Sequence, residues 1–186
     1  MLVGRALYLD RTVYQLQYES LRRFEQWLKG VDTAIMDEAP VRLFVTGSNR
    51  WKESSDWPLP ETKWVPFYLH EDGLLSEHEF WPNEASDSFE DSLWQRGSLQ
   101  YCSPPLVEDT EVIGPVAVNL YASSTDDDIF WHAYLLEIDV EGKEKLLTRG
   151  WLKGSHRAVD ESRSYPWRPF HPHTFEEKLI PNTIYD

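Results

Sequence analysis

Cysteine and positive charge are both scarce in this sequence of 186 residues. Its one cysteine, Cys102, permits no disulfide within the chain and no cysteine metal cluster, so we expect a reducing compartment such as the cytoplasm. Basic residues number 18 against 32 acidic ones, and the formal charge of -14 disfavours nucleic acid and anionic membranes as partners. Apolar runs of membrane-spanning length are absent as well.

The sequence also lacks the nucleophile motif of the α/β-hydrolases. No G-x-S-x-G pentapeptide occurs, and that motif is what lifts a serine above the sheet in those enzymes. Ser155 and His156 are neighbours in "KGSHR", but adjacent residues of a strand point to opposite faces and cannot share a proton. The residues therefore offer no serine nucleophile of the α/β-hydrolase type.

Two stretches have the composition of metal ligands but not the spacing. His171 and His173 are separated by one residue, and no third ligand is fixed nearby, which favours a surface loop over a zinc site. Asp126–Asp128 lacks the alternation of a calcium loop, which favours a solvated turn. We expect no metal and no cofactor, while an unrelated enzyme with a metal at the two histidines remains an alternative.

What the sequence does contain is one helical pattern followed by many short strand patterns. Apolar residues at three- and four-residue steps predict a helix over 14–29, with Phe24 and Trp27 on its apolar stripe and Gly30 as its cap. The period then changes to two. The predicted strands are Val41–Thr46, a hairpin around Glu71–Gly73, Ser98–Ser103, Glu111–Ser124, Asp128–Val140 and, after a turn at Glu141–Gly142, Lys145–Arg157. This order predicts a mainly β fold, an antiparallel sandwich of jelly-roll type behind one helix.

Aromatic residues are abundant, with nine Trp and nine Tyr. The segment "NRWKESSDWPLP" places Trp51 and Trp57 in what we expect to be a polar loop, held extended by Pro58 and Pro60. Exposed rings suit either a docking surface or a face that stacks on sugars. A stand-alone carbohydrate-binding module is therefore the alternative function.

Several stretches together resemble one family. "DEAPVRLFVTGSNRWKESSDWPLPET" (residues 37–62) looks like the start of the C-terminal domain of serine hydrolases of the X-Pro dipeptidyl-peptidase and cocaine-esterase type. "WVPFYLHEDGLLS" resembles that domain's first hairpin, and "LQYCSPPLVEDTEVIGPVAVNLYASSTDDDIFWHAYLLEIDVEGKEKLLTRGWLKGSHR" resembles its central strands. The resemblance covers residues 18–186 in the same order as in the family.

The resemblance implies a galactose-binding-like jelly roll without catalytic residues, whose Ser, Asp and His lie in an upstream α/β-hydrolase domain. Residues 1–36 would then be a linker and helix joining that domain, and residues 37–186 the sandwich, ending before its last strands. A sandwich with an exposed edge invites a homo-oligomer. In relatives the region before "LQYCS" lends apolar side chains to the rim of the acyl pocket, and Leu93 and Trp94 stand there in this chain. The expected docking residues are Trp51, Trp57, Phe24 and Trp27.

Overall fold

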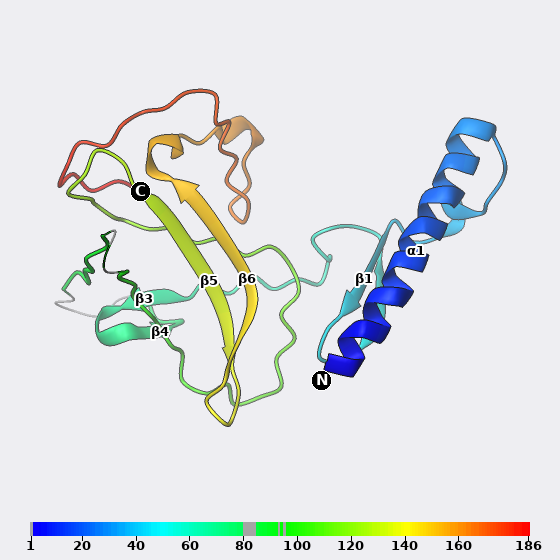
Figure 1. Ribbon diagram of the computed structural model, residues 1–186, viewed down its shortest axis with the longest axis horizontal. Helices are drawn as coiled ribbons and strands as arrows, with labels where there is room; N and C mark the ends of the chain where they lie inside the picture. The colour runs from blue at the N-terminus through cyan, green and yellow to red at the C-terminus, as the bar shows by residue number, and fades with distance from the viewer. Residues whose placement is uncertain (1, 80–84, 93, 95) are drawn as a thin grey trace. The chain divides into compact units, whose positions relative to one another are not determined.

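The computed structural model describes the backbone of residues 2–79, 85–92, 94 and 96–186, and within these ranges the side chains from residue 16 onward. The chain divides into two compact units, Met1–Gly114 and Pro115–Asp186. Figure 1 shows the elements coloured along the chain, with α1 in blue, β5 in yellow-green and β6 in yellow to orange. The boundary after residue 36 that the sequence suggests stays a prediction.

The first unit begins with the long helix α1, Leu2–Lys29. It starts well before the predicted position at Tyr14, and its sequence is rich in Leu, Gln, Glu and Arg, which favour helix. Gly30 follows with a φ of 67°, so it ends the helix in the left-handed conformation that was predicted. None of the helices in the described ranges is both long and apolar enough to cross a membrane.

Arg22 ties the end of α1 to the chain that follows. Its guanidinium donates to the Thr33 carbonyl at 3.1 Å and forms ion pairs with Glu19, one helical turn earlier, and with Glu38. The hydrogen bond from Arg22 lowers the pKa of the Glu38 carboxyl below its usual range. A short 3-10 turn, η1 (Ile35–Asp37), lies between these contacts and the first strand.

The strands β1 (Val41–Val45) and β2 (Arg50–Ser54) form an antiparallel hairpin. β1 matches the predicted strand at residues 41–46. The second arm corrects a prediction, because Trp51 lies in β2, where the sequence suggested a polar loop. Its alternating exposure fits a strand, and pairing with β1 satisfies backbone groups that a loop would leave to water.

A second hairpin joins β3 (Tyr68–His70) to β4 (Leu74–Ser76) through η2 (Glu71–Gly73), as the sequence predicted. Gly73 has a φ of 74°, and a Cβ at this position would lie 2.6 Å from the Gln100 carbonyl oxygen. Glycine is therefore required here both for the backbone conformation and for the close approach of the neighbouring segment.

That neighbouring segment was predicted as a strand over residues 98–103, and only part of this is seen. Cys102 makes an isolated parallel bridge with Leu74, donating to the Gly73 carbonyl at 2.7 Å and accepting from Leu75 at 3.0 Å. Its side chain is exposed. A third strand thus begins beside β4 but does not extend along it.

The second unit is built on the hairpin of β5 (Phe130–Ile138) and β6 (Glu144–Lys153), the longest strands of the described chain (Figure 1). The Asp139 carboxylate accepts two backbone N–H groups of the connecting turn, each at 2.9 Å, and Gly142 there has a φ of 78°. The predicted turn is therefore confirmed. A shift of register after Leu135 marks a bulge in the pairing.

The predicted strand over residues 111–124 is not formed. Ala122 makes an antiparallel bridge with Tyr185, closed by two backbone hydrogen bonds of 2.8 and 2.9 Å, and the Ser124 carbonyl accepts the Asn182 N–H at 2.7 Å. After β6 the chain forms two 3-10 turns, η3 (Gly154–His156) and η4 (Glu161–Arg163), and continues to Asp186 without a further strand. Residues 111–124 therefore contact the C-terminal segment through a few backbone hydrogen bonds and not through a continuous strand ladder.

The described strands make three two-stranded antiparallel sheets, β1–β2, β3–β4 and β5–β6. The chain is therefore β-rich behind one helix, which agrees with the coarse part of the predicted fold class. A jelly roll needs two packed sheets of about eight strands in total. That finer arrangement stays a prediction.

Few apolar side chains of the described chain are buried. Its accessible surface is 15873 Å². A compact protein of this mass exposes about 9,300 Å², and two separate bodies of the same total mass about 11,000 Å². Among the described side chains, the buried apolar residues are Val45, Leu59 and Leu179. Stability of the chain alone therefore rests on few buried groups.

Replacing Leu59 with Ala tests how much one of these groups contributes. Leu59 is 4% exposed, so we expect Leu59→Ala to lower the free energy of unfolding by about 2–4 kcal/mol, measured by urea denaturation. The matched control is Leu28→Ala on α1, where the side chain is 77% exposed and the change should stay within about 0.5 kcal/mol. Equal effects at the two positions would contradict this assignment of the core.

Candidate docking surface

The apolar stripe of α1 is open to solvent. It is made of side chains spaced three and four residues apart, and we call it the helix stripe: Tyr18, Leu21, Phe24, Trp27 and Leu28. Each of these residues is more than half exposed. The two residues predicted for docking, Phe24 and Trp27, are 59% and 61% exposed. They are therefore accessible to a partner.

The β1–β2 hairpin presents a second aromatic surface. Trp51 pairs across the strands with Phe44, and the two rings meet edge to face with centroids 5.4 Å apart. The Arg42 guanidinium lies over the Trp51 ring at 4.9 Å. Trp51 nevertheless keeps 47% of its surface exposed, so the hairpin orients the indole without covering it.

Trp57, the other predicted docking residue of this region, follows β2. The chain bends over residues 55–58 and turns at Leu59, whose carbonyl accepts the Thr62 N–H at 2.9 Å, so the predicted extended conformation is wrong. The Trp57–Pro58 peptide is cis. The two apolar side chains of this turn differ in exposure: Leu59 is buried, whereas Trp57 is 46% exposed and is available for contact with a partner.

The two residues predicted for a pocket rim are not equally described. Leu93 lies outside the described residues. Trp94 is 96% exposed, and its backbone N–H donates to the Ser92 hydroxyl at 3.3 Å. An indole with so much free surface can contact another molecule or domain.

Ser155 and His156 do not form a catalytic pair in this structure. They lie in η3 and not in a strand, so the geometric reason given from the sequence is wrong. Ser155 is 1% exposed, and His156 turns its Nε2 toward a Glu176 carboxylate oxygen at 3.5 Å. A serine shielded from solvent in this way has no route to a substrate carbonyl.

The histidines of the C-terminal segment lie near one another without forming a metal site. The His173 ring is 5.3 Å from that of His156 and 6.1 Å from that of His171. His171 Nδ1 lies 3.0 Å from the Arg157 carbonyl. Among the described residues, no group of three or more His, Cys, Asp or Glu is placed to hold a metal ion. The metal-enzyme alternative therefore gains no support.

Asp128 is the electrostatic centre of the second unit, where the sequence suggested only a solvated turn. Its carboxylate accepts the Ser155 N–H at 3.0 Å and lies 3.3 Å from the Lys153 ammonium and 3.2 Å from that of Lys178. Burial alone would raise the pKa of Asp128. The hydrogen bonds from Ser155, Lys178 and Lys153 outweigh that effect and hold the pKa well below its usual range.

This cluster joins three parts of the chain: the turn before β5, the end of β6 and the C-terminal segment. Glu176 adds a further ion pair to Lys153. Sequence reasoning missed the cluster because Asp128 and Lys178 are 50 residues apart and no local spacing links them. The only sequence signal was the aspartate run itself, which by composition alone fits a solvated turn equally well.

Comparison with known proteins gives consistent matches over most of the chain. A family model described as the X-Pro dipeptidyl-peptidase C-terminal non-catalytic domain matches residues 33–186. A predicted serine esterase of Mycobacterium bovis is 29% identical over 208 residues, covering 95% of this chain and 33% of that protein. The cocaine esterase of a Rhodococcus species is 25% identical over 169 residues, covering 72% of this chain and 29% of its own length.

A solved structure agrees with these matches. The crystal structure of a CocE/NonD family hydrolase from Staphylococcus aureus superposes with a TM-score of 0.57 at 17% identity, covering 94% of this chain and 34% of that one. The present chain thus spans about a third of the length of these relatives. The resemblance seen in the sequence is confirmed. These relatives are named as esterases or hydrolases, so the sugar-binding alternative gains no support from them.

Replacing Asp128 with Asn tests the cluster. The change keeps the side-chain shape and removes the charge facing Lys153 and Lys178, so we expect the free energy of unfolding at pH 7 to fall by about 1–2 kcal/mol. Because the folded pKa is lowered, the stabilisation is complete above the unfolded pKa of about 4 and is lost as the pH falls below it. Asp128→Asn should therefore weaken the acid dependence of stability, measured by urea denaturation at several pH values.

The control is the neighbouring Asp127→Asn. The Asp127 side chain is 69% exposed and lies 3.6 Å from the Lys178 ammonium, so its removal should change stability by less than about 0.5 kcal/mol. An equal loss for both variants would mean that general charge balance, not the Asp128 cluster, stabilises this unit.

Proposed function

The chain belongs to the family of X-Pro dipeptidyl-peptidase C-terminal non-catalytic domains, and on this premise we propose that it buttresses the catalytic domain of a serine hydrolase. The parent enzyme would cleave acyl esters, amides or X-Pro peptides through a serine acyl intermediate. Its Ser, Asp and His lie in an α/β-hydrolase domain outside this chain. The absence of G-x-S-x-G from the sequence and the burial of Ser155 are consistent with this role.

The observation that carries the proposal is the uncovered helix stripe. Covering its five side chains removes on the order of 500 Å² of apolar surface from water, a gross gain of ~12 kcal/mol. Association of two separate molecules costs about 4–15 kcal/mol in lost freedom and ordering. The stripe alone is therefore marginal for a free partner, whereas a catalytic domain joined to the same chain avoids most of that cost.

The tryptophans of the hairpin region supply a second contact with the catalytic domain. Trp51 is oriented by Phe44 and Arg42, so little side-chain freedom is lost when a partner covers it. Trp57 lies just after the same hairpin and is similarly exposed. Large aromatic side chains with a free face are typical anchors of protein interfaces.

Part of the chain also shapes the rim of the parent's acyl pocket. Trp94 is the candidate residue, together with Leu93, and the 96% exposure of the indole supports this role. An apolar side chain at a pocket rim would favour apolar acyl groups, because it lowers the cost of removing them from water. The contribution is to substrate choice and not to the chemical step.

The three hairpins are parts of a jelly roll of the galactose-binding-like kind. The likeness to the Staphylococcus aureus hydrolase structure supports a shared fold. The bridges at Cys102 and Ala122 support it too, because each places an unpaired segment beside a strand or the C-terminal segment. In the complete fold these segments would continue as full strands.

The proposal also includes an oligomeric state and a cellular compartment for the parent protein. Two-stranded sheets leave backbone groups unpaired along their edges, and a second copy of the parent protein could pair with one of them. We propose a homo-oligomer on this ground. The free and exposed thiol of Cys102 suits a reducing compartment, which favours the cytoplasm.

The test compares the 186-residue chain with the same chain joined to the hydrolase segment that we expect its reading frame to encode upstream. The joined protein should hydrolyse an aryl ester, and the chain alone should not. The double variant Phe24→Ser with Trp27→Ser should destabilise the joined protein by about 3–5 kcal/mol, because these rings become buried there. In the chain alone, the same variant should cost less than about 1 kcal/mol.

Arg23→Ser serves as the control, since Arg23 is exposed on the same helix but outside the helix stripe. It should leave the joined protein's stability nearly unchanged. Equal effects of the double variant in both proteins would overturn the docking role. An upstream reading frame without a G-x-S-x-G segment would overturn the proposed parent enzyme.

A further inference from the structure

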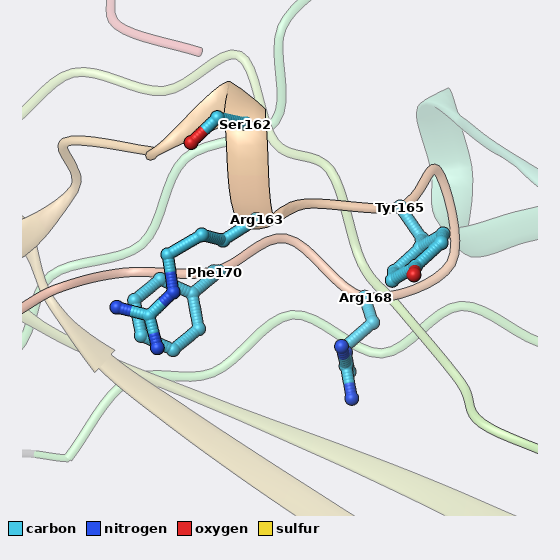
Figure 2. Close-up of a pocket in the computed structure, with 5 residues that line it drawn as sticks. All are labelled: Ser162, Arg163, Tyr165, Arg168 and Phe170. Atoms are coloured by element: carbon cyan, nitrogen blue, oxygen red, sulfur yellow. The ribbon is translucent and has the colours of Figure 1, made fainter.

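A pocket of about 480 Å³ lies in the segment after β6 and is lined by Ser162, Arg163, Tyr165, Arg168 and Phe170 (Figure 2). We propose that this pocket binds an organic carboxylate, that is, a ligand with a carboxylate group on an apolar body. The proposal does not depend on the proposed function, because every residue of the pocket belongs to this chain and lies within its second unit.

The backbone around the pocket is fixed by its own hydrogen bonds. Asp160 donates its N–H to the Phe170 carbonyl at 2.9 Å, and the Ser164 hydroxyl accepts the Phe170 N–H at 2.9 Å. Between them, Tyr165 and Arg168 exchange backbone hydrogen bonds of 3.1 and 2.8 Å. The segment therefore forms a closed loop whose backbone is held before any ligand arrives, which reduces the cost of binding.

Both arginines of the pocket have their guanidinium groups over aromatic rings. Figure 2 shows the Arg163 guanidinium over the ring of Phe170. Its carbon lies 3.7 Å from the ring centroid. The Arg168 carbon lies 5.2 Å from Tyr165 and 5.6 Å from Trp167, and these two rings stack on each other at 5.1 Å. Stacking uses the face of a guanidinium and leaves its in-plane N–H groups free.

Those N–H groups have no carboxylate partner in the part of the chain that the structure describes. Among the described residues, neither Arg163 nor Arg168 forms an ion pair or a side-chain hydrogen bond, although the chain carries 32 acidic residues. The nearby Arg157, in contrast, pairs with Glu177 at 2.9 Å. Both pocket arginines are exposed; Figure 2 shows Arg163 over Phe170 and Arg168 extending away from the loop. Their natural partner is thus an anion from outside the chain.

The lining of the pocket decides which anion fits. A guanidinium fork matches the two oxygens of a carboxylate and binds them in a bidentate manner. The rings of Tyr165 and Phe170 add apolar surface to the lining of the pocket, which an inorganic ion cannot use. The chain's formal charge of -14 further disfavours multiply charged anions. A singly charged carboxylate on an aromatic or aliphatic body satisfies all three conditions, and the volume suits a small molecule.

The test uses the 186-residue chain labelled with nitrogen-15 and follows the Nε–H signals of its arginine side chains during titration with sodium benzoate. We expect saturable shifts of two signals, assigned by their loss in Arg163→Gln and Arg168→Gln. Each of these variants should weaken benzoate binding at least about tenfold, because one arm of the site is lost.

Arg149→Gln is the matched control. Arg149 lies in β6 of the same unit, with its guanidinium 5.9 Å from the Trp151 ring, but it does not line the pocket. This variant should bind benzoate within about twofold of the unchanged protein. Circular dichroism of all three variants checks that the fold is kept, and Arg163→Lys gives a second, milder change at the site.

Four results would overturn the proposal. These are an absence of saturable shifts, a loss of binding in Arg149→Gln equal to that in the pocket variants, benzamide binding as tightly as benzoate, and inorganic phosphate binding as tightly as benzoate. The third would mean that the rings alone bind, and the fourth that charge alone does. Weaker binding of acetate than of benzoate would support the role of the aromatic faces.

Discussion

Hydrophobic burial limits what this chain can do alone. Val45, Leu59 and Leu179 are the apolar side chains buried among the described residues, while the helix stripe and the hairpin tryptophans remain open. A domain normally offsets its conformational entropy by removing apolar surface from water. Here much of that surface is arranged on regular elements but left uncovered. The described chain therefore leaves apolar surface on regular elements exposed to water.

Polar contacts take over where burial is lacking. Arg22 holds the end of α1 to the following segment, and Asp128 holds the β5–β6 hairpin to the C-terminal segment. Such contacts fix local geometry, and because the Arg22 and Asp128 side chains are only 14% and 15% exposed, these ion pairs are screened less by water than fully exposed ones. Polar contacts also order the loop that forms the arginine pocket. Its loop is ordered by backbone hydrogen bonds, so Arg163 and Arg168 need no carboxylate of this chain to be held in place.

The sequence predicted the elements whose signals are local. Periodicity predicted β1, β5 and β6, and turn chemistry predicted the hairpins at Glu71–Gly73 and Gly142. It failed where the outcome depends on distant residues. Trp51 reads as part of a polar loop until β1 is available to pair with it. The apolar alternation of residues 111–124 predicts a strand, but alternation alone does not supply a neighbouring strand to complete the hydrogen bonds.

The residues of the candidate sites were likewise identified only where the sequence signal is local. Phe24 and Trp27 were identified because a helical stripe is visible in sequence, and their exposure agrees with a surface role. The Asp128 cluster and the arginine pocket were not identified. The first joins residues far apart in the chain, and the second depends on a loop whose tight backbone bridge brings Tyr165 and Arg168 together.

The C-terminal segment has a further consequence, which concerns protein engineering. Tyr185 pairs with Ala122, accepts the Ile180 N–H on its hydroxyl and lies under the Arg157 guanidinium. A fused tag or randomised tail should therefore leave this tyrosine intact and be attached through a spacer.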